Sequence, residues 1–146
     1  MCNSRCNGNN ILNFNRRVTR GINICLQGLC QCTQGLNEVR NNNICRGTTE
    51  ISNGNCVCAQ GLACIRSAVQ NSGMQNRNIC AGLRQCTQAL RNINCGRCEI
   101  CRNNINDGIE DVESGIRDCE AGLNRIQNGI SNNTCPTNQS NTNNFA

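Results

Sequence analysis

The sequence has no histidine, lysine, tyrosine or tryptophan, and only one proline and two phenylalanines in 146 residues. Histidine and lysine supply the commonest general bases and Schiff-base amines, so their absence removes most acid–base and covalent catalysis. With Phe14 and Phe145 alone, the chain also lacks the aromatic platforms on which proteins stack nucleic-acid bases. We therefore expect neither an enzyme nor a nucleic-acid-binding protein.

Long apolar runs are missing as well. No window of about 18 apolar residues occurs, so no segment is predicted to span a membrane. The start of the chain, MCNSRCNGNN, is polar and lacks the apolar core of a signal peptide, which predicts synthesis in the cytosol without a leader. The 16 cysteines contrast with this expectation. In such a chain they indicate metal binding, or oxidation after the reducing compartment has been lost.

Asparagine, glutamine and glycine are abundant, with 29, 10 and 14 copies, and all 14 basic residues are arginines. Charge is unevenly divided along the chain. Residues 1–98 hold eleven arginines and two acids, whereas residues 99–146 hold three arginines and seven acids. Charges of opposite sign in the two parts suit pairing within one molecule or head-to-tail pairing between copies. Solvated helix faces would explain the same pattern equally well.

Glycines recur every seven residues in residues 108–130, GIEDVESGIRDCEAGLNRIQNGI, and each is followed by Ile or Leu. Apolar residues alternate at intervals of four and three, which is typical of an amphipathic helix. The same pattern recurs upstream and predicts helices over about 11–41, 47–71, 77–93 and 97–131. The economical fold is all-α, an antiparallel bundle of about four helices forming one domain over 1–131. Residues 132–146 are predicted to be a polar, disordered tail. A β-solenoid of short Asn/Gly-rich rungs is the competing prediction.

Eleven of the 14 glycines fall on this heptad grid, beside the apolar seam. Each interior glycine costs a helix about 0.5 to 1 kcal/mol relative to alanine. A column of Gly and Ala next to the seam would let two backbones approach closely, as small residues do in tightly packed helix pairs. Such helices are marginal alone, so we expect packing, cross-links or assembly to stabilise them.

The cysteines have three competing uses, of which thiolate metal binding is the first. Cys95, Cys98 and Cys101 form C-x2-C-x2-C, three of the four ligands of a ferredoxin-type cluster, but the fourth is missing at the expected offset. Structural disulfides fit this segment equally well.

The second use is copper(I) storage, because thiolates are soft ligands for a soft ion. The chain resembles the cysteine-lined four-helix copper storage bundles in size, helix number and cysteine number. That resemblance implies Cu(I) as cargo and Cys-x3-Cys pairs within helices, a spacing that only Cys2 and Cys6 have here. The cysteines predicted to face the core are instead spread among apolar residues: Cys25, Cys32, Cys58, Cys86 and Cys119.

The third use is covalent cross-linking, for which all 16 cysteines are candidates. With no lysine for isopeptide bonds and no tyrosine for dityrosine, disulfides are the available covalent link. Cys119, in the middle of the last helix, is the first place to expect a covalent partner. Six cysteines are predicted to lie off the apolar stripe or in loops and tails: Cys2, Cys6, Cys30, Cys45, Cys64 and Cys135. The remaining candidates are Cys56, Cys58, Cys80, Cys86, Cys95, Cys98 and Cys101, together with Cys25 and Cys32, which are predicted to face the core.

In its cysteine, asparagine and glutamine content the chain resembles the coat and exosporium proteins of endospore-forming bacteria. The resemblance implies a structural protein without catalytic residues or cofactor, made in the cytosol and deposited on the spore surface. It also implies assembly with itself, and with other coat proteins, into a layer or fibre that disulfides harden as the mother cell dies. No nucleic-acid or membrane partner is expected.

Overall fold

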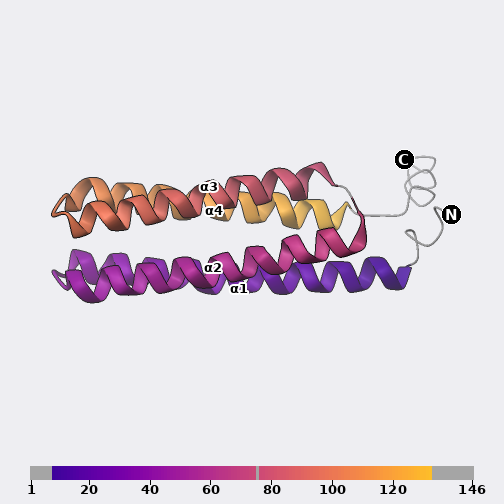
Figure 1. Cartoon of the computed structure of the whole chain (residues 1–146), viewed down its shortest axis with the longest axis horizontal. Coiled ribbons are helices and arrows are strands. Elements are labelled where there is room, and N and C mark those ends of the chain that lie inside the picture. Colours follow the sequence, from indigo (N-terminus) through magenta and orange to yellow (C-terminus); the bar gives the residue numbers. More distant parts are fainter. Residues whose placement is uncertain (1–7, 75, 133–146) are drawn as a thin grey trace.

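A computed structural model describes residues 8–74 and 76–132 of the chain. It contains four helices and, over these residues, no strand: α1 (Gly8–Arg40), α2 (Ile44–Ser72), α3 (Arg77–Cys101) and α4 (Ile105–Ser131). The helices form two antiparallel hairpins, α1–α2 and α3–α4, which lie side by side (Figure 1). The predicted all-α class with four helices is thus confirmed, and the β-solenoid alternative is wrong.

The helix boundaries differ from prediction mainly between the third and fourth helices. The sequence predicted a break near residues 94–96, but α3 continues to Cys101 and the turn lies at residues 102–104. The apolar spacing that joins Ile93 to Ile100, both buried, keeps this segment helical. Residues 52–55, SNGN, are residue types that favour turns, but they lie inside α2, within the predicted helix 47–71, and Gly54 is buried against α1. Residues 133–146 of the predicted tail lie outside the described residues.

The core is a continuous apolar seam along all four helices, as the heptad pattern predicts. Ile65, Ile93 and Ile126 are completely buried, and so are the predicted core cysteines. Phe14 closes the seam at the end of the bundle where α1 begins. The other core residues include Val18, Ile22, Leu29, Leu36, Val39, Ile51, Leu62, Ile79, Leu90, Ile100, Val112, Ile116, Leu123 and Ile130.

Glycines set the distance between the two helices of each hairpin. A Cβ added to Gly28 would lie 2.5 Å from the carbonyl oxygen of Gly54 and 2.6 Å from the amide nitrogen of Cys58. These obstacles are backbone atoms, so a rotamer change cannot relieve them. In the other hairpin, a Cβ on Gly115 would meet the Ala89 carbonyl oxygen at 2.9 Å. The glycine column therefore permits backbone-to-backbone packing, as the heptad grid predicted.

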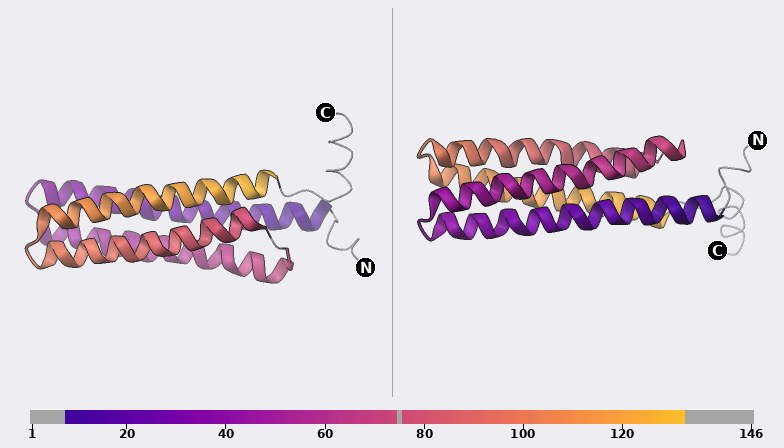
Figure 2. Two further views of the ribbon diagram at one scale, coloured as in Figure 1. Left: turned by 90° about the horizontal axis from the view of Figure 1, so that it is seen from above. Right: turned by 60° about the horizontal axis from the view of Figure 1, so that its bottom comes forward.

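The two hairpins are copies of one another, related by a shift of 61 residues. Under this shift α2 corresponds to α4, and the C-terminal 25 residues of α1 correspond to α3. The α1–α2 turn and the α3–α4 turn therefore lie at the same end of the bundle (Figure 2). The repeat relates the two hairpins by an approximate two-fold axis along the bundle. Identical pairs include Gly21/Gly82, Cys25/Cys86, Gln27/Gln88, Leu29/Leu90, Gly35/Gly96, Glu38/Glu99, Asn42/Asn103, Asn43/Asn104, Ile44/Ile105, Gly47/Gly108, Gly54/Gly115, Cys58/Cys119, Gly61/Gly122, Leu62/Leu123 and Ile65/Ile126.

Both turns end their helix in the same way, with an asparagine in the left-handed region. Asn42 has φ 72° and Asn103 has φ 70°. In the first turn the Asn43 amide donates to the Glu38 carbonyl at 2.9 Å, and in the second Asn104 donates to Glu99 at 2.8 Å. This is the Schellman pattern, in which Asn replaces the usual glycine. The shared turn keeps the two hairpins in the same register.

Candidate functional site

The structure separates the cysteines into buried and surface groups. All 13 described cysteines are free thiols. The five predicted to face the core are completely buried, which confirms that prediction. The eight others are exposed or partly exposed on α1, α2 and α3: Cys30, Cys45, Cys56, Cys64, Cys80, Cys95, Cys98 and Cys101. Cys2, Cys6 and Cys135 lie outside the described residues.

Four of the buried thiols come from one position of the repeat in each helix: Cys25 from α1, Cys58 from α2, Cys86 from α3 and Cys119 from α4. The Cys25 thiol donates to the Cys58 carbonyl at 3.1 Å, and its repeat partner Cys86 donates to the Cys119 carbonyl at 3.3 Å. The Sγ atoms of Cys58 and Cys119 lie 3.6 Å apart across the centre of the bundle. We call these four residues the thiol layer.

The heptad pattern alone does not predict the pairing of Cys58 with Cys119, although Cys119 was the first place to expect a partner. The signal was present in the sequence, because Cys58 and Cys119 are equivalent under the 61-residue shift. A two-fold axis along the bundle brings equivalent core positions face to face at its centre. Recognition of the repeat would therefore have placed Cys58 and Cys119 at the same level on opposite sides of the bundle centre.

Cys58 and Cys119 are not placed to form a disulfide. No Cα atom of α2 lies within 8 Å of a Cα atom of α4, whereas a disulfide requires Cα atoms about 4.4 to 6.8 Å apart. Both Sγ atoms reach the bundle centre from opposite sides, so closing the bond would require backbone movement. In the described part of the chain, Cys119 therefore lacks the covalent partner that was expected, and its side chain is packed in the core.

Hydrogen bonding shifts the pKa values of the cysteines in the thiol layer in opposite directions. Donation to Cys58, together with burial, raises the pKa of Cys119 and of Cys25 far above the ordinary thiol value. Side-chain hydrogen bonding to the Cys58 sulfur, first from Cys119 and then from Cys25, lowers the pKa of Cys58 to about 5, although burial acts in the opposite direction. Burial raises the pKa of Cys32, seven residues after Cys25 in α1 and thus about two helical turns along the core, to about 12. At neutral pH Cys25, Cys32 and Cys119 are therefore held as neutral thiols.

Neither metal arrangement considered from the sequence is formed as it stands. Within residues 8–74 and 76–132, no three or more Cys, Asp or Glu side chains are grouped so as to hold a metal ion. Cys95, Cys98 and Cys101 follow the outer surface of the last turns of α3, where Cys95 and Cys101 are exposed and Cys98 is partly exposed. Thiols line the core only at the thiol layer and Cys32, and the rest of the seam is Ile, Leu, Val and Ala with Phe14.

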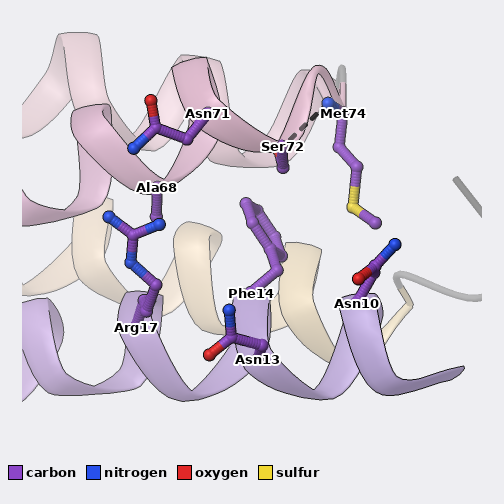
Figure 3. A pocket seen from close by; sticks show the side chains of 8 residues that line it. All are labelled: Asn10, Asn13, Phe14, Arg17, Ala68, Asn71, Ser72 and Met74. Atoms are coloured by element: carbon purple, nitrogen blue, oxygen red, sulfur yellow. Dashed lines mark hydrogen bonds between the residues drawn. The ribbon is translucent and has the colours of Figure 1, made fainter. Parts of the chain in front are cut away.

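A small pocket lies at the other end of the bundle, where α1 extends beyond the turn between the hairpins (Figure 3). The ring of Phe14 forms its apolar wall, and Met74 closes one side near Asn10 (Figure 3). Arg17 and Asn71 lie near Ala68 on the opposite side (Figure 3). Its lining contains the Ser72 hydroxyl and the Arg17 cation but no carboxylate, thiol or imidazole, so no general base lies beside the hydroxyl in this pocket.

No protein-family model, curated protein or solved structure matches the chain. Among the described helices, none combines the length and the hydropathy needed to cross a lipid bilayer. The site must therefore be interpreted from its own chemistry, which consists of completely buried core cysteines and a set of accessible thiols on the surface.

Proposed function

We propose that the protein is a structural building block that assembles with itself and is hardened by disulfides between copies. The observation that supports this most is the placement of eight accessible thiols on the outside of a rigid bundle. Cysteine is among the residues most often buried, so eight surface thiols call for a role outside the core. None of the described cysteines has a sulfur at disulfide distance, which leaves these thiols available to other chains.

The chemistry requires an oxidant of the dioxygen or small-disulfide class. Two thiols on neighbouring copies lose two protons and two electrons and form one S–S bond, while the oxidant is reduced. The surface thiols lie on α1, α2 and α3, so one copy can bond to several neighbours and a network can grow. Deposition in a spore coat or exosporium, with other coat proteins as partners, fits a chain that is made reduced and oxidised later.

The test is oxidation of two matched variants. In a common background, Cys2, Cys6 and Cys135 are replaced by serine; in the second variant the eight surface cysteines are also replaced by serine. After oxidation, non-reducing electrophoresis should show a disulfide ladder for the background and a monomer for the surface variant. Equal ladders from both variants, or a clean monomer from the background, would contradict the proposal.

Storage of copper(I) is the alternative role, and the structure favours it less. Only five described thiols face the core, and the surface thiols are separated along three helices. Titration with Cu(I) against a competing chelator should therefore show fewer than about three bound ions, since thiolates commonly share Cu(I). Uptake of more than about eight ions would support storage instead of cross-linking.

A further inference from the structure

The internal repeat gives the bundle two open faces that are equivalent in position but different in chemistry. The first face lies between α2 and α3, and the second lies between α4 and α1. The approximate two-fold axis exchanges them, so they face opposite sides of the bundle at the same height along it. These are the seams where the two hairpins meet, and they are more loosely packed than the glycine contacts within each hairpin.

The face between α2 and α3 carries a groove with a basic rim. Leu62 and Leu90 form its floor, and the exposed Arg66 and Arg91 stand at its sides. Arg66 donates to Thr87, and no acidic residue lines the groove. The Oδ1 atom of Asn55, also in the lining, is buried without a hydrogen-bond partner. We call this the basic groove.

On the opposite face, between α4 and α1, the equivalent positions hold an exposed leucine and an acidic residue. Leu26 stands at the position equivalent to Thr87, and its side chain is 45% exposed. Glu120 stands at the position equivalent to Ala59 and is exposed, without an ion pair in the described part of the chain. Cys30 replaces Arg91. We call this the Leu26 face.

We propose that the Leu26 face of one copy docks into the basic groove of the next copy. Because the faces lie on opposite sides at the same height, a sideways translation of the bundle brings Leu26 over Leu62 and Leu90. The same translation brings Glu120 towards Arg66 and Arg91. The contact joins two different surfaces, so it does not close on itself and generates an open row of parallel bundles.

This inference rests on the proposed function, because it names the surfaces through which copies assemble. It also supplies an order of events. Docking places copies side by side in the reduced state, which raises the effective concentration of the surface thiols of one copy at its neighbour before oxidation. Cys30, on the docking face itself, is carried to the neighbour's groove.

The test uses the full-length protein under reducing conditions, so that disulfides contribute nothing. Sedimentation velocity at low salt should show species that grow with protein concentration, and 1 M salt should weaken them because the screening length falls to about 3 Å. The double variant R66E/R91E and the single variant E120R should each remain monomeric over the same range. The control R84E/R125E, with the same change in net charge outside the groove, should assemble like the original chain.

Mixing the two faulty variants gives the sharper result. R66E/R91E retains a working Leu26 face, and E120R retains a working basic groove, so these two surfaces should dock. The two altered surfaces also carry opposite charges, positive in E120R and negative in R66E/R91E, so the mixture should recover rows in which the variants alternate. A chain that stays monomeric when reduced, or variants that assemble normally, would overturn the docking inference. If only the docking inference is wrong, oxidation should still produce disulfide ladders. If only the proposed function is wrong, oxidation should give no ladders, while the reduced protein should still assemble in sedimentation velocity.

Discussion

At the scale of single residues, the molecule depends on two small side chains used for opposite reasons. Glycine is placed where a Cβ would strike the backbone of the neighbouring helix, as at Gly54 against α1. Cysteine is placed where the bundle centre has room for one polarisable atom from each side, as at Cys58 and Cys119. Both choices lower the intrinsic helix propensity, and tertiary packing compensates for that loss.

The glycine contact predicts an unusual response to alanine. Gly54→Ala should lower the free energy of unfolding by about 1 to 3 kcal/mol, because overpacking against the backbone outweighs the gain in helix propensity. Asn53→Ala, at the adjacent exposed position, should be neutral or slightly stabilising. Urea unfolding of both variants under reducing conditions measures the difference. A more stable Gly54→Ala protein would show that the helices are not in close contact there.

The free energy of unfolding should depend on pH through Cys32. Its folded-state pKa is raised by burial to about 12, above the ordinary value of about 8.5, so the unfolded chain releases this proton first. Its contribution to stability is complete below about pH 8.5 and declines by about 1.4 kcal/mol per pH unit as the pH rises towards 12. Cys32→Val should remove this part of the alkaline slope, since Ile93 occupies the equivalent position in the repeat. Urea unfolding of both proteins between pH 8 and 11 would reveal identical slopes if Cys32 were already ionised in the folded state.

At the scale of elements, the helix starts differ in how they are capped. The Asn76 side chain accepts hydrogen bonds from the amides of Asn78 and Ile79 at 3.0 and 3.1 Å, and it donates to the Gly129 carbonyl at 3.1 Å. Asn104 precedes α4 without a side-chain cap. Asn76, in the loop between the two hairpins, therefore fixes the start of α3 and links it to the end of α4 within the second hairpin.

Alanine substitution at these caps should separate the two roles. Asn76→Ala should cost about 0.5 to 2 kcal/mol of unfolding free energy, because two amides lose their acceptor. Asn104→Ala should cost much less, since no side-chain bond is lost. Thermal unfolding followed by circular dichroism compares the two variants, and equal losses would contradict the assigned capping.

At the scale of the whole molecule, the bundle protects one set of thiols and presents another. In the reduced native protein, a small alkylating reagent should modify the eight surface cysteines quickly. Cys25, Cys32, Cys58, Cys86 and Cys119 should react only after unfolding by denaturant, because they are completely buried. Peptide mass spectrometry reads both sets in one experiment. Rapid modification of Cys58 in the native state would mean that the bundle centre opens easily.

The sequence by itself determined the helices, their apolar seam, the division of core from surface cysteines and the close approach at the glycines. These features follow from a seven-residue period that acts locally along each helix. The break between α3 and α4 was misplaced because continued apolar spacing outweighed the expected break near residues 94–96, and the Schellman turn at Asn103 is visible only in backbone geometry. Which helices pair, and that Cys58 meets Cys119 at a distance unsuited to a disulfide, depended on the tertiary structure. The same holds for the two unlike faces, because contacts between distant segments arise from the packing of whole hairpins.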